Sequence, residues 1–151
     1  MTASRTLHFR PVRAEDGDAL ASLRVDAMRE SLERAGRFDP QRARDRFLKT
    51  FSPPDTYEVL IDGRRAGFFV LRRQGADLLL DHLYLKTEFQ NQGIGAEVLR
   101  HVFERADDLQ VAVRVGALRG SPANRFYARH GFEFIEQVDV DNYYVRRPRR
   151  R

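Results

Sequence analysis

Two short clusters of residues have the types and spacing to bind a phosphorylated ligand and to act on it. The first, residues 90–95 (Gln-Asn-Gln-Gly-Ile-Gly), follows an apolar run and opens a helical pattern. A glycine-rich turn between a strand and a helix exposes backbone N–H groups, and the helix dipole there also favours an anion. The second, residues 124–132, contains an asparagine, two adjacent aromatic residues and a Gly-Phe pair. Because the glycines alone would also fit an ordinary strand–helix turn, it is the co-occurrence of both clusters that indicates a binding site.

The glycine turn differs from two common phosphate-binding motifs. A Rossmann fingerprint requires a third glycine where Val98 stands, and no lysine follows the glycines as a P-loop requires. The pattern Q-x-x-G-x-G at residues 90–95 instead resembles the acyl-CoA pyrophosphate loop of the GCN5-related N-acetyltransferase (GNAT) family. The segment 83–89 before it, and Asn124 followed by Phe-Tyr and Gly-Phe in the second cluster, also resemble that family's motifs.

The resemblance implies that the chain binds acetyl-CoA as its cosubstrate. Backbone amides of residues 90–96 would surround the pyrophosphate, and the backbone of residues 83–85 would pair with the pantetheine arm, with an N–H near Leu85 as the oxyanion donor. Asn124 would contact the arm, unless it is an ordinary cap or turn residue. The residues expected to bind the cofactor are Leu83, Tyr84, Leu85, Gln90, Asn91, Gln92, Gly93, Ile94, Gly95, Ala96 and Asn124.

Tyr127 is the expected general acid for the departing thiolate. A phenol has a pKa of about 10 and is therefore protonated at neutral pH. Tyrosines with this role are frequent in the family, although Tyr127 could also be a core aromatic residue like its neighbour Phe126.

The general base that takes the proton of the amine has two candidates on the strand before the loop. The position where some family members carry glutamate is Leu79 here. Asp81, two residues later, lies on the same face of a regular strand. His82 lies on the opposite face, but its unperturbed pKa of about 6.5 suits the role better. If neither acts, the protein binds the small neutral fraction of the amine from solution.

The elements that must position these residues predict an α/β (α+β) fold with a single GNAT-like domain over residues 1–147 and a basic tail over residues 148–151. We expect a mixed sheet of six to seven strands and about four flanking helices, and the resemblance to the family implies a splay between the fourth and fifth strands. Hydrophobic periodicity and turn residues predict strands at 7–10, 57–61, 67–72, 78–85, 111–115, 132–138 and 142–147. Helices are expected at 20–32, 40–51, 96–106 and 122–130, and Asp62-Gly63 should close a hairpin.

Composition excludes several kinds of site. The 151 residues contain no cysteine, which rules out disulfides, cysteine-bound zinc and a thiol nucleophile. The four histidines show no metal-ligand spacing, so we expect no metal. The start of the chain lacks the apolar core of a secretory signal, and no apolar run reaches the length of a membrane span. We therefore expect a cytoplasmic enzyme without a membrane partner.

The net charge of +5 raises the question of a nucleic-acid partner. The number of positive charges near the C-terminus equals this net charge. They belong to arginines 146, 147, 149, 150 and 151. Terminal basic tails are usually solvated, so we do not expect nucleic acid to be the main partner.

The sequence therefore predicts an N-acetyltransferase that moves an acetyl group to a primary amine of a small molecule or peptide by direct attack on the thioester. A non-catalytic acyl-CoA-binding regulatory module and an arginine-rich nucleic-acid-binding protein are the alternatives. Exposed strands near the C-terminus leave a homodimer open.

Overall fold

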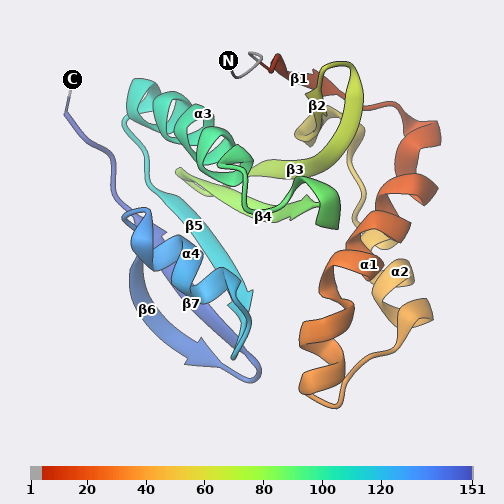
Figure 1. The fold of residues 1–151 in the computed structure, drawn as a ribbon. Coiled ribbons are helices and arrows are strands. Elements are labelled where there is room, and N and C mark those ends of the chain that lie inside the picture. Colours follow the sequence, from red (N-terminus) through yellow and green to blue (C-terminus); the bar gives the residue numbers. More distant parts are fainter. Residues whose placement is uncertain (1–4, 151) are drawn as a thin grey trace. The chain divides into compact units, whose positions relative to one another are not determined.

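The computed structural model describes residues 5–150, in which four α-helices and seven strands follow one another in the order that the sequence predicts, with three short 3-10 helices between them (Figure 1). The helices are α1 (Gly17–Arg34), α2 (Pro40–Lys49), α3 (Ile94–Leu109) and α4 (Ala123–Arg129). The strands are β1 (Leu7–Pro11), β2 (Thr56–Ile61), β3 (Arg64–Gln74), β4 (Asp77–Leu85), β5 (Val113–Leu118), β6 (Glu133–Val138) and β7 (Asp141–Arg146). The predicted fold class is confirmed.

The strands form one mixed sheet in the order β1-β2-β3-β4-β5-β7-β6. β4 and β5 run parallel, whereas β1–β2, β2–β3, β5–β7 and β6–β7 are antiparallel pairs. The β4–β5 ladder begins at Leu78↔Val113 and ends at Leu80↔Val115, although β4 continues to Leu85 and β5 to Leu118. This early end of the ladder is the splay that the sequence predicts between the fourth and fifth strands.

Contacts among the described residues divide the chain into two compact units. We call residues 5–70 and His82–Gln90 the N-terminal unit, and Leu71–Asp81 with residues 91–150 the C-terminal unit. Because β3 and β4 each cross from one unit to the other along the chain, both units take part in the sheet.

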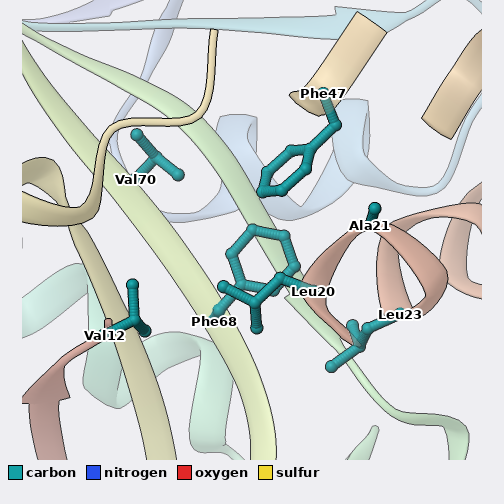
Figure 2. Packing of buried hydrophobic residues seen from close by; sticks show 7 residues of the cluster. All are labelled: Val12, Leu20, Ala21, Leu23, Phe47, Phe68 and Val70. Atoms are coloured by element: carbon teal, nitrogen blue, oxygen red, sulfur yellow. The ribbon is translucent and has the colours of Figure 1, made fainter. Parts of the chain in front are cut away.

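The core of the N-terminal unit is formed by α1, α2 and β3 (Figure 2). Phe47 of α2 points at Phe68 of β3, with ring centroids 5.4 Å apart, and Leu20 of α1 packs beside them. Burial of each such side chain stabilises the fold by about 1.5–3 kcal/mol. The remaining members of the cluster are Val12, Ala21, Leu23 and Val70.

Local sequence signals explain where several elements begin and end. The carboxylate of Asp39 accepts a hydrogen bond from the N–H of Arg42 at 3.1 Å, and Pro40 occupies the first turn, so α2 starts there. Asp62 and Gly63 both have positive φ (51° and 79°), as a two-residue hairpin turn of type I′ requires. The predicted hairpin is therefore confirmed.

β5 begins two residues later than the sequence predicts. The N–H of Val111 donates to the carbonyl of Ala106, and Gln110 adopts a left-handed conformation with φ 54°. The N–H of Gln110 also donates to the carbonyl of Asp107. Carbonyl groups at the end of α3 thus have hydrogen-bond partners, as in many helices that end at a left-handed residue. Val111 therefore belongs to the helix end, despite the high strand propensity of valine.

A buried ion pair holds the end of the chain in the C-terminal unit. Arg146 of β7 is 6% exposed and donates to both carboxylate oxygens of Asp107 in α3, at 2.6 and 3.2 Å. Its guanidinium also lies 4.3 Å from the ring centroid of Phe103, and the N–H of Arg149 donates to Asp107. Counting Arg146 as part of a solvated tail is therefore wrong, because its charge is compensated inside the fold. Arg151 lies outside the described residues.

We predict that Asp107→Asn lowers the free energy of unfolding by about 3–5 kcal/mol, because Arg146 would remain buried without a carboxylate. Glu30→Gln is the matched control: its pair with Arg34 is exposed, and we expect a change below about 1 kcal/mol. Urea denaturation of both variants measures the difference. Equal decreases in the free energy of unfolding would show that the buried Asp107–Arg146 pair stabilises the fold no more than an exposed ion pair does.

Candidate active site

The turn before α3 has a backbone suited to hold an anion. Asn91 and Gly93 both have positive φ, 61° and 80°, and Gly93 directly precedes the first residue of the helix. The N-cap residue is Gly93 itself, which has no side chain with which to cap the helix. In any α-helix the first amides have no carbonyl partner one turn earlier, and here these belong to Ile94, Gly95 and Ala96. A negative group would satisfy these amides and interact favourably with the helix dipole.

Gly95 has a packing role that the sequence did not indicate. A methyl group on Gly95 would lie 3.0 Å from the end of the Phe126 ring in α4. The absence of a side chain therefore lets α4 approach the first turn of α3. This contact fixes the position of the second cluster relative to the glycine turn within the C-terminal unit.

The side chain of Gln90 connects the end of β4 with the loop that follows it. Its amide nitrogen donates to the carbonyl of Leu85 at 3.0 Å. The N–H of Lys86 donates to the carbonyl of Ala66 at 2.8 Å, which joins the same end of β4 to β3. The geometry of the loop is therefore set by bonds to the strands on which it rests.

Gly67 of β3 allows a close approach of the β4 backbone. A methyl group on Gly67 would lie 2.1 Å from the carbonyl oxygen of Tyr84 and 3.0 Å from the Cα of Leu85. Both neighbours are backbone atoms, so neither can move aside without displacing the strand. Gly67 is not among the site residues expected from the sequence, although a glycine inside a strand is a signal for close backbone approach.

Asp81 forms an ion pair within the C-terminal unit. The Nε of Arg72 donates to its carboxylate at 2.8 Å, and the carboxylate side chain is 32% exposed. The negative charge of this candidate base is thus compensated by a neighbouring cation.

His82 lies against aromatic rings of the N-terminal unit. Its ring centroid is 5.4 Å from that of Phe47, and its Nδ1 is 3.4 Å from the hydroxyl of Tyr84. That hydroxyl donates to the sulfur of Met28 in α1 at 3.3 Å. A wall of aromatic and sulfur-containing side chains therefore covers this face of β4, with the imidazole and the phenol as its polar groups.

Tyr127 of α4 is 6% exposed. Its ring centroid is 5.3 Å from that of Phe132 and 6.5 Å from that of Tyr144. Phe126, the residue beside it, makes the contact with Gly95 at the start of α3. The ring of Tyr127 is therefore packed among aromatic side chains of the C-terminal unit, one residue along the chain from the contact with Gly95.

The side chain of Asn124 joins three parts of the C-terminal unit. Its nitrogen donates to the carbonyls of Leu118 and Ser121, at 2.9 and 3.0 Å. Its oxygen accepts from Asn142 at 2.9 Å and from the hydroxyl of Tyr144 at 2.8 Å. These bonds use both the donor and the acceptor capacity of the amide. Asn124 thereby fixes the start of α4 to β5 and β7.

The part of the chain that the structure describes offers neither a metal site nor a membrane-spanning helix. Residues 5–150 contain no group of three or more His, Asp or Glu side chains able to hold a metal ion. In the same residues, no helix is both long and apolar enough to cross a membrane.

Comparisons with known proteins agree with this geometry. A family model described as an acetyltransferase (GNAT) domain matches residues 54–134. A search of curated proteins found no match.

Solved structures share the fold at low sequence identity. The PaiA N-acetyltransferase from Thermoplasma acidophilum, in complex with coenzyme A, is 17% identical with a TM-score of 0.77 over 94% of this chain and 99% of that chain. An acetyltransferase from Thermus thermophilus is 18% identical with a TM-score of 0.72, over 94% and 97%. N-acetylglutamate synthase from Neisseria gonorrhoeae, with coenzyme A and N-acetyl-glutamate, is 16% identical with a TM-score of 0.66, over 96% and 36%.

We predict that Gly67→Ala lowers the free energy of unfolding by about 1–3 kcal/mol, because the new methyl group must displace the β4 backbone. Gly116→Ala is the control, since a methyl group there would meet only the ring of Tyr143, a partly exposed side chain that can turn away. Thermal and urea unfolding compare the two variants. A Gly67→Ala protein as stable as the wild type would contradict the close approach of β3 and β4.

Proposed function

Because the chain belongs to the GNAT family, we propose that it is an N-acetyltransferase that moves an acetyl group from acetyl-CoA to a primary amine. The observation that carries this proposal is the start of α3, where Gly93 at the N-cap position has left-handed backbone and no side chain, which leaves a helix N-terminus suited to a pyrophosphate. The acceptor is a small molecule or a peptide, and the proposed location is the cytoplasm.

The cosubstrate would be bound mainly by backbone groups. Amides of residues 90–96 would bind the pyrophosphate, and the pantetheine arm would add to residues 83–85 like a further strand. Support for the second contact comes from β4, which continues to Leu85 after its last pair with β5 at Leu80. Two similar solved structures contain coenzyme A, which supports this choice of cosubstrate. Asn124 and Gln90 would then act by positioning backbone, since their side chains bond within the protein.

The proposed reaction is direct attack of the neutral amine nitrogen on the carbonyl carbon of the thioester. A backbone N–H near Leu85 would stabilise the oxyanion. The C–S bond then breaks, the C–N bond remains, and the thiolate of CoA takes the phenolic proton of Tyr127. Support for Tyr127 comes from its neighbour Phe126, which contacts the first turn of α3.

The proton of the amine leaves by His82 or directly to water. We favour His82 over Asp81 for this role, because the Asp81 carboxylate is paired with Arg72. The imidazole lies beside the Tyr84 hydroxyl on the strand that would carry the thioester. A water molecule between the amine and His82 would complete the transfer.

A non-catalytic acyl-CoA-binding module is the second candidate function. The Asp81–Arg72 pair and the low exposure of Tyr127 favour it, since both groups would need to reach reacting atoms in an enzyme. This candidate predicts binding of acetyl-CoA without turnover of any amine. The nucleic-acid alternative is weaker, because Arg146 is buried with Asp107.

We predict saturable binding of acetyl-CoA in a calorimetric titration, weakened at least about 10-fold by Gly93→Glu. The substitution forces a side chain into left-handed backbone and places a negative charge at the phosphate site. Gly36→Glu is the control. It introduces the same charge at a glycine that also has positive φ (68°) but lies after α1, and this variant should bind acetyl-CoA with the affinity of the wild type. Binding that is insensitive to Gly93→Glu would exclude the glycine turn as the phosphate site.

We predict that Tyr127→Phe lowers kcat about 100-fold or more while the Kd of acetyl-CoA is unchanged, because the ring remains and only the proton donor is lost. Tyr143→Phe, at an exposed tyrosine, is the control. Steady-state assays of CoA release give both values. Full turnover by the Tyr127→Phe enzyme would exclude Tyr127 as the proton donor and assign it a packing role only.

A further inference from the structure

Arg24 of α1 is a buried cation whose charge no carboxylate of the described chain compensates. The residue is 9% exposed, and its one hydrogen bond runs from Nη1 to the carbonyl of Ala43 in α2, at 2.5 Å. Its Nε is the only buried side-chain polar atom within residues 5–150 that lacks a hydrogen-bond partner. Arg146, the other arginine that is as deeply buried, has both oxygens of Asp107.

The unused part of the guanidinium has the geometry that binds a carboxylate. Nε and Nη2 lie on the same edge of the planar group, and two parallel N–H donors on one edge match the two oxygens of a carboxylate. Within the described chain, Nη2 forms no hydrogen bond either. A buried charge and a buried N–H without partners are both unfavourable, so an anion that binds this edge would be strongly stabilised there.

The position of Arg24 on α1 places it opposite the aromatic face of β4. Leu20, one helical turn earlier, packs with Phe47 in the core cluster (Figure 2). Met28, one turn later, accepts the hydrogen bond from Tyr84. Phe47 and Tyr84 both contact His82. The helix turns on either side of Arg24 thus each pack against a neighbour of this histidine.

We propose that Arg24 binds a carboxylate of the acceptor, so that the amine acetylated by this protein belongs to an amino acid or to a peptide with a free C-terminus. This inference rests on the proposed N-acetyltransferase function and names its acceptor class. A carboxylate carries the single negative charge that one guanidinium edge compensates, whereas a phosphate monoester carries nearly two. The apolar stem of the acceptor would contact Met28 and Tyr84, which are both partly buried.

The test compares acceptors that differ only in the carboxylate. Release of CoA from acetyl-CoA is measured with the common amino acids and a set of dipeptides, each as the free acid and as the C-terminal amide. Butylamine and spermidine serve as amines without a carboxylate, and phosphoethanolamine as a phosphorylated amine. We expect the best acceptor to be a free acid, with a KM about 10- to 100-fold lower than that of its amide. Because the panel contains both free amino acids and dipeptides, the better acceptor of the two shows whether the carboxylate is that of an amino acid or of a peptide C-terminus.

Variants of Arg24 connect that preference to the residue. Arg24→Met keeps the apolar stem and should raise the KM of the acid about 10- to 100-fold, so that acid and amide become equal. Arg24→Lys, which keeps the charge and loses the planar edge, should restore part of the preference. Arg44→Met is the control, because Arg44 also joins α1 and α2, through Asp18 and Ser22, but is paired.

Two outcomes would overturn the inference while the proposed function stands: a best acceptor without a carboxylate, or an acid preference that survives in Arg24→Met. Calorimetric binding of acetyl-CoA by each variant shows that it is folded and separates these outcomes from failure of the function itself. Thermal stabilisation by the same acids gives a readout without turnover. Stabilisation that requires both the carboxylate and Arg24 supports the site, and its absence for every acid in the panel contradicts it.

Discussion

The start of α3 is the constraint on which the candidate site depends. A side chain at the N-cap position commonly stabilises a helix by about 1 kcal/mol, and Gly93 at that position has none. Gly93 instead enters the helix with left-handed backbone, at the end of the loop that connects β4 with α3. Phe126 packs on Gly95 in the first turn, which places α4 and Tyr127 beside the same helix end. Changes to this turn would therefore alter the proposed phosphate site and the position of the proposed acid together.

The surroundings of the turn are rigid for a physical reason. Asn124 uses its whole amide to join α4 to β5 and β7, and Gly67 lets β3 and β4 approach more closely than any side chain would allow. Within each unit, the parts that would bind the cosubstrate are thus held by backbone contacts and buried polar bonds. Such bonds are unfavourable to break in a low-dielectric interior, so the geometry is in place before a ligand arrives.

The two buried arginines show how the same residue type can serve structure or binding. The guanidinium of Arg146 contacts the carboxylate of Asp107 and the ring of Phe103, so its charge is compensated without a ligand. Arg24 has one carbonyl and an unused donor edge. The contrast is the physical basis for assigning Arg24 to a ligand, because a chain that needed only packing at this helix position could use an apolar residue.

Local signals in the sequence were sufficient for the order of elements and for the Asp62-Gly63 hairpin, and the family resemblance was sufficient for a splay between the fourth and fifth strands. They could not reveal partners that lie far away along the chain. Composition suggested a solvated tail that includes Arg146, but its position depends on Asp107 in another element. The packing of Gly95 on Phe126, the bonds of Asn124 and the unpaired state of Arg24 likewise depend on tertiary contacts. An arginine one turn from both Leu20 and Met28, inside an apolar helix stripe, was the available signal for Arg24.

The proposed function requires that backbone amides at the start of α3 bind the pyrophosphate of CoA. An NMR titration of ¹⁵N-labelled protein with CoA observes these amides one by one. We predict that the largest changes in amide chemical shift fall on Gly93, Ile94, Gly95 and Ala96, with saturation at the affinity found by calorimetry. Saturable shifts elsewhere, with these four amides unmoved, would contradict it.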